Sequence, residues 1–483
     1  MTTRTEKDTM GPMTVPAGAL WGASTQRAVE NFPISGRPIP PGIIHAYGHL
    51  KAACAFVNHA LGRLNDARFA SITRAAMEIA AGKHDAQFPI DVFQTGSGTS
   101  TNMNANEVIA NLVCLQHARP IGSSKDPAYI GGPTGAGVHP NDHVNAGQSS
   151  NDTFPTAIHI AAALAIHNEL LPALTHLGTR LDALAQKWDR VIKIGRTHLQ
   201  DATPIRLGQE FSGYAHQVRC AQQRAMEALE TLEELPIGGT AVGTGINTHE
   251  DFGRMVSSYL KDTLRVNFRE AANHFEAQHA KDGVVEASGH LKTIAVSLSK
   301  IASDIRLMGC GPRCGIGELK IPAVQPGSSI MPGKVNPVII EAVVMVCCRV
   351  IGNDATITTA GLGGVGGLLD LHVAMPVMGE ALLDSIHLLA RSCRVFTDNC
   401  LSGLEADERR CAELIEGSLA MCTSLVPVIG YDRSAALAKQ AHAEGKTVRA
   451  LAIEQKILTE KQLGELLDPM SMTLPGGEGS AGG

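Results

Sequence analysis

Apolar residues recur at helical spacing along four long stretches of the chain, which are separated by short polar loops rich in Gly, Ser, Thr and Asn. These stretches are approximately Thr156–Arg190, Leu207–Leu235, Asn273–Met308 and Pro337–Thr359. The first would be about 50 Å long if it were helical throughout, since an α-helix rises about 1.5 Å per residue. Pro172 lies inside it and is a candidate kink. The pattern predicts an extended bundle of long helices whose wide apolar faces pack between subunits.

The segments on either side of these stretches have a different pattern. Residues 1–146 contain short helical stretches punctuated by Gly and Pro clusters, and strand-like alternation is sparse throughout the chain. From about Cys400 the helical pieces are shorter, and the chain ends in PGGEGSAGG, which we interpret as a frayed tail. We therefore predict a mainly α fold of three domains. They are an N-terminal mixed, mainly helical domain (1–146), a central long-helix bundle (147–397) and a small C-terminal helical domain (398–483).

Composition narrows the class of protein. A chain of 483 residues with 44% hydrophobic and 18% charged residues is typical of a folded protein with more than one core. A net charge of −6 and the lack of a basic stripe argue against nucleic acid or an acidic membrane as partner.

The most apolar stretch, Val338–Gly352, is too short to span a bilayer and predicts a buried helix. No secretory signal is evident, and eleven cysteines, an odd number, favour the reducing cytoplasm.

The cysteines do not have the spacing of a metal site. Cys310 and Cys314 are separated by three residues, Cys347 and Cys348 are adjacent, and the chain contains no C-x₂-C pair. We expect these side chains to be small buried hydrophobic groups, and we expect no metal.

A polar loop at Gln94–Glu107 places many small polar side chains before a predicted helix. Its glycines permit positive φ, and Ser97, Thr99 and Asn102 offer neutral hydrogen-bond donors, which suits a bound carboxylate. The alternative is an elaborate N-cap, although the polar residues outnumber what one cap needs.

A second polar stretch, His139–Asp152, carries Ser149–Asn151 immediately before a long helix, again a position that favours anions. Asp142 and His143 are either an acid/base pair or a solvated turn, and the pattern alone favours the turn for His143.

A third stretch, Gly195–Pro204, contains His198, a candidate acid/base group because imidazole titrates near neutral pH. One histidine among nineteen is ordinarily unremarkable, but its polar neighbours Thr197, Gln200 and Asp201 strengthen the case.

A phosphate-binding loop has four residues between its glycines and a Ser or Thr directly after its lysine. The fourth stretch, Gly327–Pro337, has five residues between its glycines and Val335 after Lys334, so it is not such a loop. It is instead a flexible loop carrying two hydroxyls, one ammonium and one amide: Ser328, Ser329, Lys334 and Asn336. Glu341 on the following helix could orient a catalytic histidine.

Together these stretches resemble the fumarase/aspartase superfamily, and specifically its class II fumarases. Seven motifs run in the family's order: SGTxxNMNxNE at Ser97–Glu107, HPNDxVN at His139–Asn145, QSSND at Gln148–Asp152, GRTHLQDATP at Gly195–Pro204, GGTAVGTGIN at Gly238–Asn247, GPRCGIGE at Gly311–Glu318 and GSSxMPxKxNP at Gly327–Pro337.

The resemblance implies reversible hydration of fumarate to malate without a cofactor, in a homotetramer with a twenty-helix bundle and active sites each built by three subunits. It implies that Ser328 removes the Cβ proton of malate, and that His198, paired with Glu341, handles the proton of the hydroxyl or water. The residues expected to bind the two substrate carboxylates are Ser97, Gly98, Thr99, Ser149, Ser150, Asn151, Thr197, Ser329, Lys334 and Asn336.

Two other functions are compatible with this fold. Aspartate ammonia-lyase is the first, but aspartases tend to read QSTND where this chain has Ser150. A non-catalytic structural protein is the second, and the presence of Ser328, His198 and Lys334 argues against it.

The chain departs from the class II pattern at two places. Ala136 stands where these fumarases commonly have Arg, which predicts poor or no anion binding at the secondary site mapped to His139, Asn141 and Asp142. His372 replaces an Asn of the family's FELNV segment.

Overall fold

The computed structural model describes residues 2–475, so the predicted frayed tail lies outside the described residues except for Pro475. By their contacts the residues form two compact units. The first comprises Met1–Pro172, Gln223–Ala295 and Val346–Arg391, and the second comprises Ala173–Gln222, Val296–Met345 and Ser392–Gly483. The domain boundaries expected from the sequence remain predictions.

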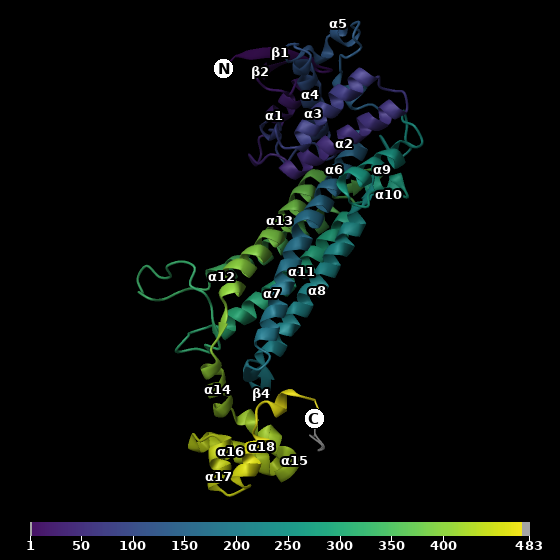
Figure 1. The fold of residues 1–483 in the computed structure, drawn as a ribbon. Helices are drawn as coiled ribbons and strands as arrows, with labels where there is room; N and C mark the ends of the chain where they lie inside the picture. Colours follow the sequence, from purple (N-terminus) through teal and green to yellow (C-terminus); the bar gives the residue numbers. More distant parts are fainter. Residues whose placement is uncertain (1, 476–483) are drawn as a thin grey trace. The chain divides into compact units, whose positions relative to one another are not determined.

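Helices dominate the described chain (Figure 1). The five long helices that follow α6 are α7 Leu171–Lys187, α8 Leu207–Leu232, α11 Asp282–Met308, α12 Val338–Ala360 and α13 Met375–Asn399. The helices before or between them are α1 Ala23–Asn31, α2 Pro41–Ala60, α3 Asp66–Ala80, α4 Thr99–Gln116, α5 Pro127–Ile130, α6 Ser150–Ala165, α9 Phe252–Leu264 and α10 His274–His279. The C-terminal helices are α14 Glu408–Gly417, α15 Val426–Ile429, α16 Tyr431–Glu444, α17 Val448–Glu454 and α18 Glu460–Leu466.

The strands of the described residues form small two-stranded sheets. Four are antiparallel: β1 Thr3–Asp8 with β2 Gly11–Pro16, β3 Ile192–Thr197 with β4 Gln200–Arg206, β7 Leu319–Lys320 with β10 Glu405–Ala406, and β8 Gly367–Leu368 with β9 Leu371–His372. One is parallel, β5 Glu234–Leu235 with β6 Arg269–Glu270.

The long helices bury a regular stripe of side chains. On α11 the stripe alternates steps of three and four residues: Val284, Ala287, Leu291, Ile294, Leu298, Ile301 and Ile305. Polar contacts link neighbouring helices, since Asp354 on α12 accepts from Ser288 (2.9 Å) and Lys292 (2.7 Å) on α11. This spacing and these contacts confirm the predicted bundle of long helices.

Two of the predicted helices are interrupted. The first stretch is helix α6, a wide π-helical turn at Ile166–Leu170, and then α7. In a regular α-helix the N–H of residue 172 would donate to the carbonyl of Asn168, but Pro172 has no N–H. The wide turn includes Asn168. The third stretch is two helices, α10 and α11, so its prediction as one helix is wrong. The break is at Lys281, whose ammonium donates to carbonyls at the end of α10, including that of Gln278 (3.3 Å).

Helix α12 is buried on one face only. Ile340, Val343 and Cys347 are buried, whereas Met345 is 66% exposed. The prediction of a buried helix therefore holds for one face within a single chain. The prediction of buried cysteines is wrong for Cys314 and Cys348, which are exposed.

One stretch of residues 2–475, Ser150–Lys187, is long and apolar enough to cross a membrane by length and composition alone. Within the fold, 61% of its most apolar window is buried, which is how a core helix of a folded protein behaves.

His372 is fully buried and both ring nitrogens have partners. Nε2 donates to the carbonyl of Ala360 (3.1 Å), and Nδ1 accepts from the amide of Ala374 (3.3 Å). Burial lowers the pKa of His372 to about 4, so the ring is neutral near pH 7. The histidine therefore links the end of α12 to the segment that leads into α13.

We expect His372→Asn to lower the free energy of unfolding by about 1–3 kcal/mol, because the shorter side chain cannot reach Ala360 and leaves a void. Urea unfolding measures this, with Leu368→Ala as control because Leu368 is 70% exposed. Equal midpoints for wild type and His372→Asn would contradict this account.

Candidate active site

Two of the predicted loops meet through their hydroxyl groups. Helix α4 begins at Thr99 and α6 at Ser150. The Thr99 Oγ1 lies 2.7 Å from the Ser150 Oγ and 2.8 Å from the Ser97 Oγ. Because the positive dipole ends of two helices meet at this junction, it favours a bound anion.

The first turn of α6 is also capped, as the alternative interpretation expected. The Ser149 Oγ accepts from the Asn151 amide (3.2 Å), and the Ser149 amide donates to the Asp152 Oδ1 (2.9 Å), which makes a capping box. The Asn151 Nδ2 donates to the carbonyl of Ala241 (2.8 Å) in the loop Gly238–Asn247. We call Ser97, Thr99, Ser149, Ser150 and Asn151 the polar cluster.

Glycines allow the first loop its close packing. Gly98 has a φ of 72° and is the residue before α4, and a Cβ there would lie 2.1 Å from the ring of Phe154. A Cβ on Gly96 would lie 1.8 Å from the carbonyl oxygen of Val373. The loop therefore reaches α6 and the segment after β9 only with glycine at these positions.

Two charged residues beneath the polar cluster were missed by sequence reasoning. Asp152 is fully buried and accepts from the amides of Ser149 (2.9 Å), Gly238 (3.2 Å) and Thr240 (2.9 Å). Burial raises the pKa of Asp152 to about 6, against the opposing effect of these amides. Lys51 is the second, and a single lysine inside the apolar helix α2 was the signal that could have revealed it.

Asn102 does not offer a donor to a ligand, contrary to the sequence-based expectation. It is 2% exposed, its Oδ1 accepts from Lys51 (2.8 Å), and its Nδ2 donates to the Asn145 Oδ1 (3.1 Å). The amide supports the loop from inside the fold.

The predicted secondary site is a wide turn, Pro140–Val144. The Nδ1 of His139 accepts from the amides of Asn141 (3.3 Å) and Asp142 (3.2 Å), and it lies 3.2 Å from the Asp142 Oδ2. His143 accepts from the amide of His139 (2.8 Å), and burial lowers its pKa to about 4. His143 is thus a structural acceptor within the turn, as the pattern favoured. Poor or no anion binding at His139, Asn141 and Asp142 remains a prediction.

His198 lies at the tip of the β3–β4 hairpin. Thr197 pairs with Gln200, which leaves a two-residue turn of His198 (φ 57°) and Leu199 (φ 59°). Positive φ at both positions is the geometry of a type I′ turn. Thr197 and His198 are exposed in the single chain. The imidazole therefore projects from the tight turn of a paired hairpin.

The loop Gly327–Pro337 closes on itself around Ser328. The Ser328 Oγ accepts from the amides of Ile330 (3.2 Å) and Met331 (3.0 Å), and the Ser328 amide donates to the Lys334 carbonyl (3.2 Å). A Cβ on Gly327 would lie 1.5 Å from that carbonyl, so the turn requires glycine. Two backbone N–H groups aimed at one oxygen stabilise negative charge on it.

The predicted partner of His198, Glu341, is exposed in the first turn of α12. Within residues 2–475 of one chain, no hydrogen bond or ion pair joins His198 to Glu341 or to Ser328. Ser329, Lys334 and Asn336 lie in the same stretch as Ser328, and the first two are exposed.

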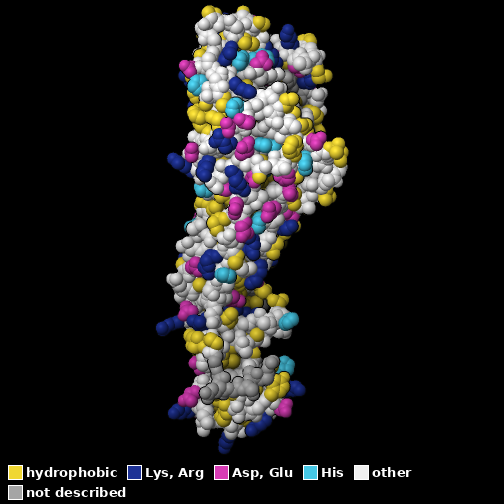
Figure 2. Space-filling model, turned by 90° about the vertical axis from the view of Figure 1, so that its right-hand side faces the viewer, with side chains coloured by type: hydrophobic (Ala, Val, Ile, Leu, Met, Phe, Trp, Pro, Cys, Tyr) yellow, Lys and Arg dark blue, Asp and Glu magenta, His cyan; other side chains and the backbone are white. Residues whose placement is uncertain are grey.

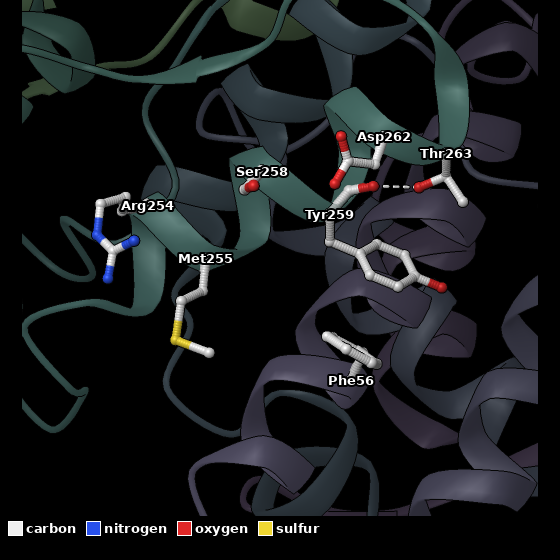
Figure 3. Close-up of a pocket in the computed structure, with 7 residues that line it drawn as sticks. All are labelled: Phe56, Arg254, Met255, Ser258, Tyr259, Asp262 and Thr263. Carbon is white, nitrogen blue, oxygen red and sulfur yellow. Dashed lines mark hydrogen bonds between the residues drawn. The ribbon is translucent and has the colours of Figure 1, made fainter.

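A hollow of about 380 Å³ lies between α2 and α9, lined in part by Phe56, Arg254 and Tyr259 (Figure 3). The Phe56 and Tyr259 rings are 4.7 Å apart, and none of the predicted site residues lines this hollow. Across the described residues, no three His, Cys, Asp or Glu side chains are grouped as metal ligands would be. The face drawn in Figure 2 intersperses basic and acidic side chains without a large patch of one sign.

Comparison with known proteins assigns the family. A family profile described as "Lyase" matches residues 11–352, and one described as "Fumarase C C-terminus" matches residues 421–474. A Corynebacterium glutamicum protein named fumarate hydratase class II is 51% identical over 475 residues, covering 97% of this chain and 96% of that protein. The chain belongs to the class II fumarase family.

Other members of the class II fumarase family agree. Fumarate hydratase class II of Mycobacterium tuberculosis is 53% identical over 466 residues, covering 96% of this chain and 94% of that protein. The crystal structure of a class II fumarase from Schistosoma mansoni matches with a TM-score of 0.91 and 37% identity, covering 98% of this chain and all of that one (100%). The family and the fold class predicted from the sequence are confirmed.

Proposed function

We propose that this member of the class II fumarase family is a hydro-lyase that interconverts fumarate and malate. The observation that carries the proposal is the Ser328 Oγ held by two backbone amides within a motif that matches the family. Relatives above 50% identity over almost the whole chain bear the name fumarate hydratase class II, which disfavours the ammonia-lyase alternative.

In malate dehydration, Ser328 as an alkoxide takes the Cβ proton, and the electron pair of that C–H bond moves onto the adjacent carboxylate. The resulting dianionic aci-carboxylate then expels hydroxide, which leaves as water with a proton delivered by His198. The two amides that hold the Ser328 hydroxyl also favour its alkoxide.

The substrate carboxylates are bound, in this proposal, by two sets of donors. Thr99, Ser149, Ser150 and Asn151 are half-buried, so they are protected from water yet reachable by a ligand. Ser97 and Gly98 are buried and support this set. The second set comprises Thr197, Ser329, Lys334 and Asn336.

The site is completed, in this proposal, by a homotetramer with three chains at each active site. Several large apolar side chains on the long helices are exposed in one chain: Met226, Val296, Leu307, Met345, Ile351 and Val395. Exposed apolar residues in such number on a bundle indicate burial by other subunits. Pairing between chains would also bring Glu341 to His198.

We also propose that the enzyme works in the cytoplasm. Cys314 and Cys348 are exposed free thiols, which suits a reducing compartment.

The function is tested by adding malate to purified protein without added metal. We expect absorbance in the fumarate band to rise with malate and to stay constant with aspartate. Absorbance that rises with aspartate and not with malate would transfer the assignment to an ammonia-lyase.

A further inference from the structure

Lys51 is a buried cation without a carboxylate partner. Its side chain is on α2 and is 0% exposed. The ammonium donates to three neutral amide oxygens: Asn102 Oδ1 (2.8 Å), Asn145 Oδ1 (3.1 Å) and Gln148 Oε1 (2.9 Å). Among the described residues, no carboxylate lies within ion-pair distance of it. A buried charge that lacks a counter-charge is costly and calls for an explanation.

The partners of Lys51 support the polar cluster directly. Asn102 lies one helical turn after Thr99 on α4, and Gln148 immediately precedes Ser149. Asn145 joins the two, since its Oδ1 also accepts from the Asn102 Nδ2 (3.1 Å) and its Nδ2 donates to the Gln148 carbonyl (3.2 Å). One ammonium therefore holds the start of α4 and the approach to α6 in a fixed arrangement.

The titratable groups around Lys51 do not neutralise it. The Asp152 carboxylate acts on it only at longer range, and its oxygens are already taken by three backbone amides. Tyr47 and Cys54, on the same helix, have pKa values raised by burial, so both remain neutral near pH 7. Burial lowers the pKa of Lys51 itself to about 7.

We propose that Lys51 is a positioning residue for dicarboxylate binding, which locks the polar cluster in place and supplies the buried positive charge that a bound carboxylate offsets. This inference rests on the proposed function, because it takes the polar cluster to be a carboxylate site.

Calorimetric titration with succinate, a four-carbon dicarboxylate with no double bond to hydrate, tests the inference apart from turnover. In the intact oligomer, Lys51→Met keeps the length of the side chain and removes its charge. We expect its Kd for succinate to rise about tenfold or more, as loss of a nearby charge in a medium of intermediate dielectric predicts.

Asn102→Asp is a second variant that leaves the lysine in place. It gives Lys51 a carboxylate within the fold, so the bound anion is no longer needed as its counter-charge. We expect a similar increase in Kd, with a thermal midpoint equal to or above that of the wild type. This variant keeps the test decisive if Lys51→Met does not fold.

Lys281→Met is the matched control. Lys281 is also buried (5% exposed) with a pKa lowered to about 7, but its ammonium donates to backbone carbonyls at the end of α10. Its loss should lower the thermal midpoint and leave the Kd for succinate unchanged.

The pH dependence gives a further readout. A bound anion favours the charged form of Lys51. The affinity for succinate should therefore weaken as the pH rises from about 7 to about 9, because the free enzyme loses this charge over that range. Tyr47 and Cys54 stay neutral over this window and Asp152, with a pKa of about 6, stays ionised. The dependence should be absent in Lys51→Met and retained in Lys281→Met.

A Kd for succinate that is unchanged in Lys51→Met and Asn102→Asp would overturn the inference and leave Lys51 a purely structural residue. A protein that binds succinate in this lysine-dependent way but does not hydrate fumarate would instead refute the proposed function.

Discussion

Replacing Ser328 with Ala should lower the rate of malate dehydration by a factor of about 10² to 10⁴, the range that a positioned general base contributes. The structure gives the physical reason. The amides of Ile330 and Met331 point at the Ser328 Oγ, so the site is built to hold negative charge at that atom. Alanine offers no oxygen to accept either bond or the Cβ proton. Initial rates with malate, followed as fumarate absorbance, measure the effect.

Ile330→Ala is the control for this experiment. Ile330 is 83% exposed on the same loop, and its amide, which the substitution keeps, is one of the two donors. We expect a rate close to that of the wild type. If Ser328→Ala turned over as fast as Ile330→Ala, the proton would have to be taken by another group.

His198→Asn should also remove most turnover, by a factor of about 10² or more, because the amide cannot exchange a proton near neutral pH. Asparagine is the suitable replacement here, since it tolerates the positive φ of 57° that the hairpin turn imposes. The β3–β4 hairpin should therefore keep its shape, so the loss reports on the imidazole. The measurement is the initial rate with malate and, separately, with fumarate.

Leu199→Asn is the matched control, because it also places an asparagine in this turn but keeps the imidazole. Leu199 occupies the other position of the turn, with a φ of 59°, and is 71% exposed. The Leu199→Asn enzyme should retain activity. Light scattering of Leu199→Asn and of His198→Asn should each give four times the chain mass of 50.9 kDa. A tetrameric His198→Asn enzyme with normal rates would remove histidine from the mechanism.

Much of the helical framework could be predicted because the apolar pattern determines it. The prediction Leu207–Leu235 corresponds to α8, Leu207–Leu232, and Pro337–Thr359 corresponds to α12, Val338–Ala360. The break at Lys281 could not be predicted, because the lysine ends α10 through side-chain bonds to backbone carbonyls. The β1–β2 hairpin was also missed, since its first strand alternates exposed and half-buried polar residues rather than apolar and polar ones.

Some residues of the candidate site could also be predicted from the sequence, and others could not. Residues on loops before helices, such as Thr99 and Ser150, could be found because several small polar groups before a helix exceed the need for a cap. Asp152 could not be ranked from the sequence, and Lys51 could be noticed only as a lone lysine in an apolar helix, because the importance of both lies in burial and in partners far along the chain. Asn102 shows the opposite error, since a motif position rich in donors faces the interior.

The hairpin that carries His198 constrains how this region can diverge. Most surface connections accept an extra residue at little cost. Between Thr197 and Gln200 an insertion would turn a two-residue connection into a three-residue one with a different backbone path. The imidazole would move by more than the roughly 1 Å that reacting groups tolerate. We therefore expect working relatives to differ in the amino acids of this connection but to keep its length.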